Sequence, residues 1–204
     1  MDNEWIEVQK IYAGPIISLL GIILTAFLVS RYTYRNYLKQ KWYENQRLAY
    51  SKLKAIQVPF QQYAQLYASN DINQQAHEIR YRNFSKHIED YNTATLFLKE
   101  RFEAMKSFYK EQKELFEVLS TIEAYFEVDK ELQDAVDSLY KFKTMSIAQL
   151  PQDLENTEQL TELYDLGMQE ISDFIQNEHE SKFENLIKIL RSRLKIAENS
   201  LKRD

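Results

Sequence analysis

Residues 11–30 read IYAGPIISLLGIILTAFLVS, a stretch without any charged residue that is bounded by Lys10 and Arg31. At a rise of about 1.5 Å per residue, a helix of this length spans roughly 30 Å, the thickness of the hydrocarbon core of a bilayer. The preceding residues are acidic and the apolar run is long, which is unlike a cleavable signal peptide. We therefore expect residues 11–30 to form a retained transmembrane helix, preceded by a short extracytoplasmic N-terminus at residues 1–10.

Basic residues are concentrated immediately after this stretch. Lysine and arginine near the ends of a span favour the cytoplasmic side of a membrane. We therefore expect a single-pass protein of the bacterial inner membrane, with its N-terminus outside and residues 31–204 in the cytoplasm. The residues expected at the interface with the lipid bilayer are basic or aromatic: Arg31, Arg35, Lys39, Lys41, Trp42 and Tyr43.

Small residues recur at near-helical spacing within the apolar stretch. Gly14, Ser18 and Gly21 lie close to one face of the expected helix. Small residues let two helices approach closely in a bilayer, so this face is a candidate helix-pairing surface.

The remainder of the chain has the composition of an all-α protein. It contains three glycines and three prolines in 204 residues, whereas strands joined by tight turns need more of both. We expect a basic stalk helix over residues 31–70, kinked near Pro59, with a turn at residues 69–71. An antiparallel cytoplasmic helical bundle over residues 71–204 should follow.

Apolar residues repeat in steps of three and four within the expected bundle, which predicts core-facing helices. The strongest such seam comprises Leu98, Phe102, Met105, Tyr109, Phe116, Leu119 and Phe126. Four flanking residues widen this seam into a core-facing face: Phe97, Phe108, Leu115 and Ile122. Asp129 is placed to cap a shorter helix, and Leu150-Pro151 marks a break. Two further helices are expected over residues 156–176 and 180–202.

Composition excludes several kinds of chemistry. The chain has no cysteine, which removes disulfides and cysteine-ligated zinc. None of His77, His87 and His179 has a second histidine three or four residues away, so we expect no metal site and no cofactor. The net charge is −5 and the acidic residues lie mainly beyond residue 54, which argues against a nucleic-acid partner.

One local string is similar to a known catalytic motif. Residues 82–87 read RNFSKH, and an arginine, a polar residue and a following histidine resemble the signature of HEPN domains. These are helical bundles, many of which are ribonucleases. The resemblance implies that His87 would act as general acid or base, that Arg82 would hold the scissile phosphate and that Asn83 would orient it.

A second resemblance covers more of the chain. The apolar stretch followed by KWYENQRLAYSKL is similar to an uncharacterised group of small bacterial single-span membrane proteins. These carry a W-[WY]-E-x-x-x-x-A-Y stretch just inside the membrane, and some are thought to lie near phage-defence genes or on mobile elements.

Three functions remain open from the sequence. The first is a membrane-anchored cytoplasmic helical protein without its own catalysis, which binds an unknown cytoplasmic protein or forms a homo-oligomer. The second is a membrane-tethered HEPN-like ribonuclease of the abortive-infection type. The third is a ligand-gated membrane effector in which the span oligomerises.

Overall fold

The computed structural model describes residues 2–142 and 149–201, with side chains from residue 18 onward. Within these ranges the chain is all-helical and contains no strand, as the composition predicted. The helices are α1 (Asp2–Ile79), α2 (Ile88–Tyr125), α3 (Lys130–Tyr140), α4 (Thr157–Phe174) and α5 (Ser181–Leu201). A π-helical segment, η1 (Arg80–Ser85), continues α1, and another, η2 (Ile175–Glu180), joins α4 to α5.

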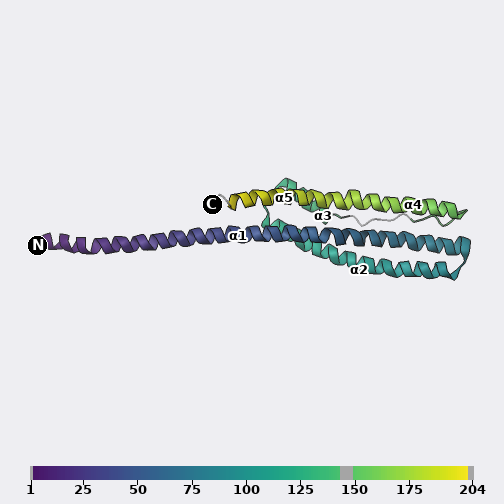
Figure 1. Ribbon diagram of the computed structural model, residues 1–204, viewed down its shortest axis with the longest axis horizontal. Coiled ribbons are helices and arrows are strands. Elements are labelled where there is room, and N and C mark those ends of the chain that lie inside the picture. Colours follow the sequence, from purple (N-terminus) through teal and green to yellow (C-terminus); the bar gives the residue numbers. More distant parts are fainter. Residues whose placement is uncertain (1, 143–148, 202–204) are drawn as a thin grey trace.

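The bundle is elongated and is organised around α1 (Figure 1). α2 returns along α1 in the opposite direction, and α4, η2 and α5 together form a second antiparallel helix beside it. The short α3 packs against α5. The N-terminal part of α1 extends well beyond the other helices, so α1 is both a rod and a member of the bundle.

Among the residues that the structure describes, no helix is both long enough and apolar enough to cross a membrane. The expected span falls partly outside the residues whose side chains are described. Residues 11–17, and with them Gly14, belong to that part, whereas residues 18–30 continue α1 with described side chains.

Two hydrophobic cores lie at different heights along α1. The proximal core joins α1, α2, α3 and α5; its fully buried members include Leu53, Phe60, Leu119, Leu132 and Phe183. The distal core joins α1 to α4 and to the segment that precedes α4; it contains Ala68, Ile72, Ala76, Ile79, Leu150, Leu160 and Ile171. α1 therefore contributes to both cores.

The prediction of a turn at residues 69–71 was wrong, because α1 continues unbroken through this region and through Pro59. Asn70 is buried and Asp71 pairs with Arg101 of α2, so packing against neighbouring helices overrides the local turn preference. The chain reverses instead at Lys86, whose φ of 50° is left-handed. The backbone N–H of Lys86 donates to the carbonyl of Tyr81 at 3.2 Å and closes the helix.

Other boundaries agree with the sequence predictions. The Asp129 carboxylate caps α3 by accepting a hydrogen bond from the backbone N–H of Leu132 at 2.9 Å. Residues 149–156 are non-helical around the Leu150-Pro151 break, and Asn156 caps α4. α5 covers nearly the whole of the expected last helix.

The seam predicted on α2 is only partly buried. Leu119 and Phe126 belong to the proximal core, but Phe102 and Tyr109 are 50% and 53% exposed. Phe108, Leu115 and Ile122, which were predicted to widen the seam, are buried as expected. The full set of buried residues of α2 is Ala94, Ala104, Phe108, Leu115, Val118, Leu119 and Ile122. The periodicity correctly identified an apolar stripe, but part of that stripe is left uncovered.

Candidate functional site

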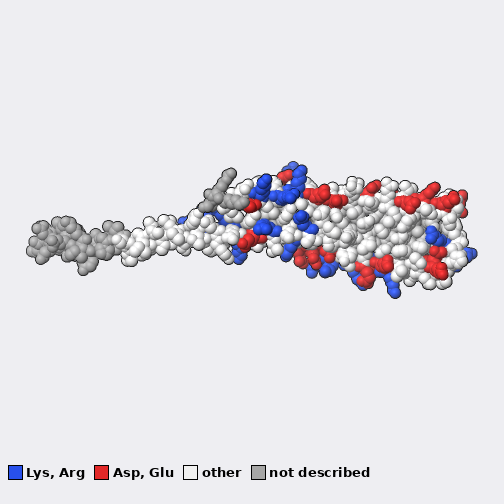
Figure 2. All heavy atoms as spheres, in the orientation of Figure 1, with Lys and Arg blue, Asp and Glu red and all other residues white. Residues whose placement is uncertain are grey.

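The most unusual surface of the described chain is the apolar segment, which we define as residues 18–30 of α1. Its large side chains are 55–66% exposed: Leu19, Leu20, Ile22, Ile23, Leu24, Phe27, Leu28 and Val29. The segment protrudes beyond the bundle, and its surface is free of lysine, arginine, aspartate and glutamate (Figure 2). No described part of this chain covers it. Ser18 and Gly21 lie on this segment, and a Cβ at Gly21 would meet no atom within 4 Å.

The basic residues expected at the membrane interface follow the apolar segment directly. Arg31, Arg35 and Lys41 are exposed, and Lys39 is half-buried. Since α1 is continuous here, these side chains form a charged collar at the base of the exposed apolar surface.

Trp42 and Tyr43, which were also expected at the interface, lie where the bundle begins. The Trp42 ring packs edge-on against Tyr125 at the end of α2, with ring centroids 5.3 Å apart. The Gln46 side chain donates to the Tyr125 carbonyl at 2.7 Å, and Ala49 is fully buried in the proximal core. The part of α1 at residues 42–50 thus packs against the C-terminal end of α2.

The HEPN-like string lies at the opposite end of the bundle, around the turn between η1 and α2. The Asn83 amide donates to the carbonyl of Gln152 at 2.6 Å. The Arg82 guanidinium donates to the Gln152 side chain at 3.4 Å and lies 3.6 Å from Glu78. His87 is exposed and immediately precedes α2. Arg82 and Asn83 therefore attach the segment before α4 to the end of the α1 rod.

A cluster at this turn, which the sequence did not predict, is centred on Asp90. Its carboxylate accepts a hydrogen bond from the Ser85 hydroxyl and lies 3.2 Å from Nδ1 of His77. The pKa of Asp90 lies below its ordinary value of 3.8. The hydrogen bond from Ser85 lowers it most, and His77 and Arg80 lower it further. In a Ser-His-Asp triad the histidine lies between the serine and the aspartate. Here the aspartate lies between the serine and the histidine, and its contacts hold the turn to the end of α1.

The lowered pKa of Asp90 predicts a pH-dependent stability. Because the native pKa lies below the unfolded one, the carboxylate stabilises the fold above pH 3.8 and loses this effect as the pH falls through the native pKa. Ser85→Ala should lower the free energy of unfolding by about 1 kcal/mol near neutrality. Urea unfolding at pH values from about 7 to 3 measures this effect. The difference in free energy of unfolding between Ser85→Ala and wild type should become smaller at the acid end of the range.

Ser200→Ala is the matched control for this measurement. Its hydroxyl donates to the Ala197 carbonyl on an exposed part of α5, so its effect on stability should not change with pH. If the difference in free energy of unfolding between Ser85→Ala and wild type is the same at every pH, the role given to Asp90 is contradicted.

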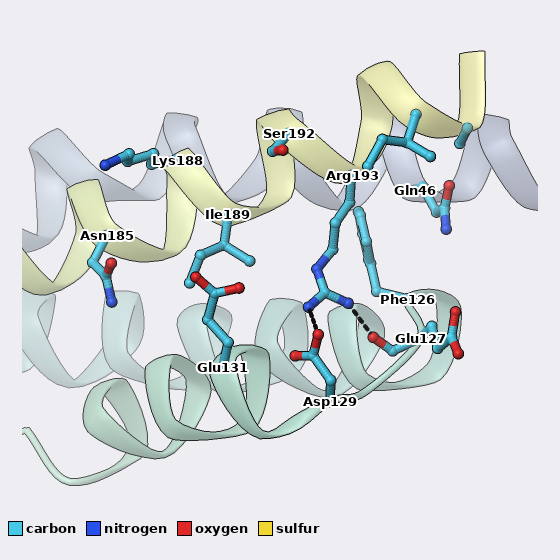
Figure 3. A pocket seen from close by; sticks show the side chains of 12 residues that line it. Gln46, Phe126, Glu127, Asp129, Glu131, Asn185, Lys188, Ile189, Ser192 and Arg193 are labelled. Atoms are coloured by element: carbon cyan, nitrogen blue, oxygen red, sulfur yellow. Dashed lines mark hydrogen bonds and ion pairs between the residues drawn. The ribbon is translucent and has the colours of Figure 1, made fainter. Parts of the chain in front are cut away.

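A cleft with a volume of about 600 Å³ lies between α5 and the turn that precedes α3. Figure 3 shows Arg193 reaching from α5 to Asp129 and to the backbone carbonyl of Glu127. The pKa of Asp129 is lowered mainly by the hydrogen bond from the Leu132 N–H, and to a smaller extent by the hydrogen bond from the Arg193 guanidinium. Arg193 thus ties α5 to the α2–α3 turn. The sequence identified Asp129 as a cap, but it held no local signal for its partner 64 residues away.

The third histidine, His179, lies in η2 and is 2% exposed. Its ring contacts those of Phe60, Phe142 and Phe174, with centroids 5.4, 4.5 and 5.3 Å away. No group of three or more histidine, aspartate or glutamate side chains within the described ranges is arranged to hold a metal ion. His179 is a packing residue of the proximal core.

Comparisons with family models, with curated proteins and with solved structures found no match to this chain.

Proposed function

We propose that the protein is a membrane-anchored helical interaction protein of the bacterial inner membrane, in which residues 11–30 insert into the bilayer and the bundle binds protein partners in the cytoplasm. The observation that carries the proposal is the apolar segment, whose large side chains are more than half exposed and have no cover from the described chain.

The energetics of the apolar segment support a bilayer as its environment. Burying one large aliphatic or aromatic side chain is worth about 1.5–3 kcal/mol. Eight such residues in the apolar segment are exposed, so moving them into hydrocarbon would contribute on the order of 10 kcal/mol. The collar of Arg31, Arg35, Lys39 and Lys41 would then lie among head groups on the cytoplasmic side.

The rod geometry supports a role in binding rather than in anchoring alone. From residue 31 to residue 79, α1 would extend roughly 70 Å from the bilayer at the helical rise per residue. Two helices pack along most of this length. Such an arrangement holds the long faces of α2 and α4 away from the membrane, where other proteins can reach them.

Membrane fractionation and topology reporters test this function. The full chain, expressed in bacteria, should sediment with membranes and resist extraction by alkaline carbonate and by high salt. A C-terminal green fluorescent protein should be fluorescent, whereas a C-terminal alkaline phosphatase should be inactive. Recovery in the soluble fraction would contradict the anchor, and an active phosphatase would contradict the orientation.

A further inference from the structure

The outer surface of α2 carries an exposed ridge that alternates lysine with aromatic residues. Steps of three and four residues, which follow one side of a helix, connect Lys99, Phe102, Lys106, Tyr109 and Lys113. All five are exposed, and the two rings are 50% and 53% exposed. We call these five residues the lysine–aromatic ridge. Lys106 pairs with Glu103 at 2.6 Å, but both side chains are largely in solvent, so this pair is weak and exchangeable.

The outer surface of α4 is acidic. α4 contains no lysine or arginine, and its exposed side chains include Glu158, Glu162, Asp165 and Asp173, with Leu166 57% exposed among them. We call these five residues the acidic ridge. No ion pair within the described ranges joins any of these carboxylates to a basic side chain of the same chain.

The two ridges overlap in part along α1, and the acidic ridge lies nearer to the end of α1 at Ile79. Arg101 of α2 pairs with Asp71 and lies over the Tyr67 ring, 5.3 Å from its centroid. Tyr164 of α4 donates to Asn73 at 2.9 Å. Each ridge is about 20 Å long at the helical rise per residue. α2 and α4 also run in the same direction, antiparallel to α1 (Figure 1).

The partial overlap of the two ridges has a consequence for copies that share one membrane. If α1 of every copy leaves the bilayer at the same residue, neighbouring rods are parallel and in register. Part of the lysine–aromatic ridge of one copy then stands level with part of the acidic ridge of the next. Leu166 would lie nearly level with Phe102, and charged residues would flank this apolar contact, which is the usual arrangement of an apolar centre with a charged rim.

We propose that the partner of this surface is a second copy of the chain, with the lysine–aromatic ridge on α2 of one copy docked on the acidic ridge on α4 of its neighbour. This inference rests on the proposed membrane anchor, because the anchor supplies the parallel register. Confinement to a membrane also raises the effective concentration of the copies, so a modest interface suffices.

Charge reversal with rescue tests the proposal. The first variant carries Lys99→Glu, Lys106→Glu and Lys113→Glu; the second carries Glu158→Lys, Glu162→Lys and Asp165→Lys. Each variant alone sets like charges against each other and should associate about tenfold less than wild type. The two variants mixed, or all six changes in one chain, restore opposite charges and should restore association.

Cysteine cross-linking in native membranes supplies the readout. The chain has no cysteine of its own, so Glu103→Cys in one copy and Gln169→Cys in another place one thiol beside each ridge. A short bismaleimide should join the two cysteines when both ridges keep their natural residues. The yield of this cross-link should fall at high salt, because salt screens the charges. The matched control, Lys188→Glu with Arg191→Glu and Lys195→Glu, changes the charge equally on exposed residues of α5 and should leave the yield unchanged.

Several outcomes would overturn the interface. These are absence of the wild-type cross-link, equal loss in the α5 control, and failure of the mixed variants to regain it. Circular dichroism of each variant establishes that it is folded. The membrane fraction is measured in the same samples, so failure of the anchor appears as soluble protein, whereas failure of the interface appears as anchored protein that does not cross-link.

Discussion

Phe60→Ala is expected to lower the free energy of unfolding by about 3–5 kcal/mol. Phe60 is completely buried, and its ring contacts those of Phe108, Phe142, His179 and Phe183, with centroids 4.8–5.7 Å away. One side chain on α1 thus joins α2, the segment that follows α3, η2 and α5. Truncation would leave a cavity that these four elements cannot all close, because each is also held by other contacts.

Thermal and urea unfolding of the full chain in detergent measure this effect. A loss of this size corresponds to a fall of roughly 10 °C in the midpoint for a chain of this length. Phe102→Ala is the matched control, because it removes the same ring from a site that is 50% exposed; it should change the stability by about 0.5 kcal/mol. Similar midpoints for the two variants would show that Phe60 is not central to the core.

Local signals in the sequence predicted the elements that depend on local physics. The cap at Asp129 and the break at Leu150-Pro151 depend on neighbouring residues, and both are confirmed. The turn expected at residues 69–71 failed for the opposite reason. Asn70 is a turn former by propensity, but it is buried within a helix whose neighbouring residues contact both α2 and α4.

Contacts between distant residues could not be predicted from one sequence. Arg193 meets Asp129, and Asn83 meets the carbonyl of Gln152, but neither pair has a local pattern that connects it. Helical periodicity likewise marked the stripe containing Phe102 and Tyr109 without showing what would cover it. For these two residues it therefore predicted burial where the structure has exposed side chains.

The apolar segment depends both on a local property, which the sequence shows, and on its lack of contact with distant residues, which only the structure shows. The absence of charge in residues 11–30 is a local property that predicts insertion, and the structure adds that the described part of this segment has no cover from the rest of the chain. Residues in such a segment contribute nothing to either core. Changes there should therefore affect location without affecting the stability of the bundle.

Leu20→Arg combined with Leu24→Arg is therefore expected to release the protein from membranes while leaving the bundle folded. At the centre of a span, leucine favours insertion by about 0.5 kcal/mol and arginine opposes it by about 2.5–3.5 kcal/mol. The two changes together therefore shift the insertion free energy by roughly 6 kcal/mol, which is more than a thousandfold in the equilibrium. Carbonate-washed membranes should lose the double variant to the soluble fraction.

Leu38→Arg combined with Leu48→Arg is the matched control, because both leucines are about half exposed and lie beyond the apolar segment on the same helix. This variant adds the same charge, on the side of the span where basic residues are favoured, and should stay in the membrane pellet. Both double variants should keep the unfolding midpoint of wild type in detergent. Retention of Leu20→Arg/Leu24→Arg in the pellet would mean that something other than insertion of the apolar segment holds the protein at the membrane. Release of the control as well would mean that added charge, rather than its position in the span, causes the loss.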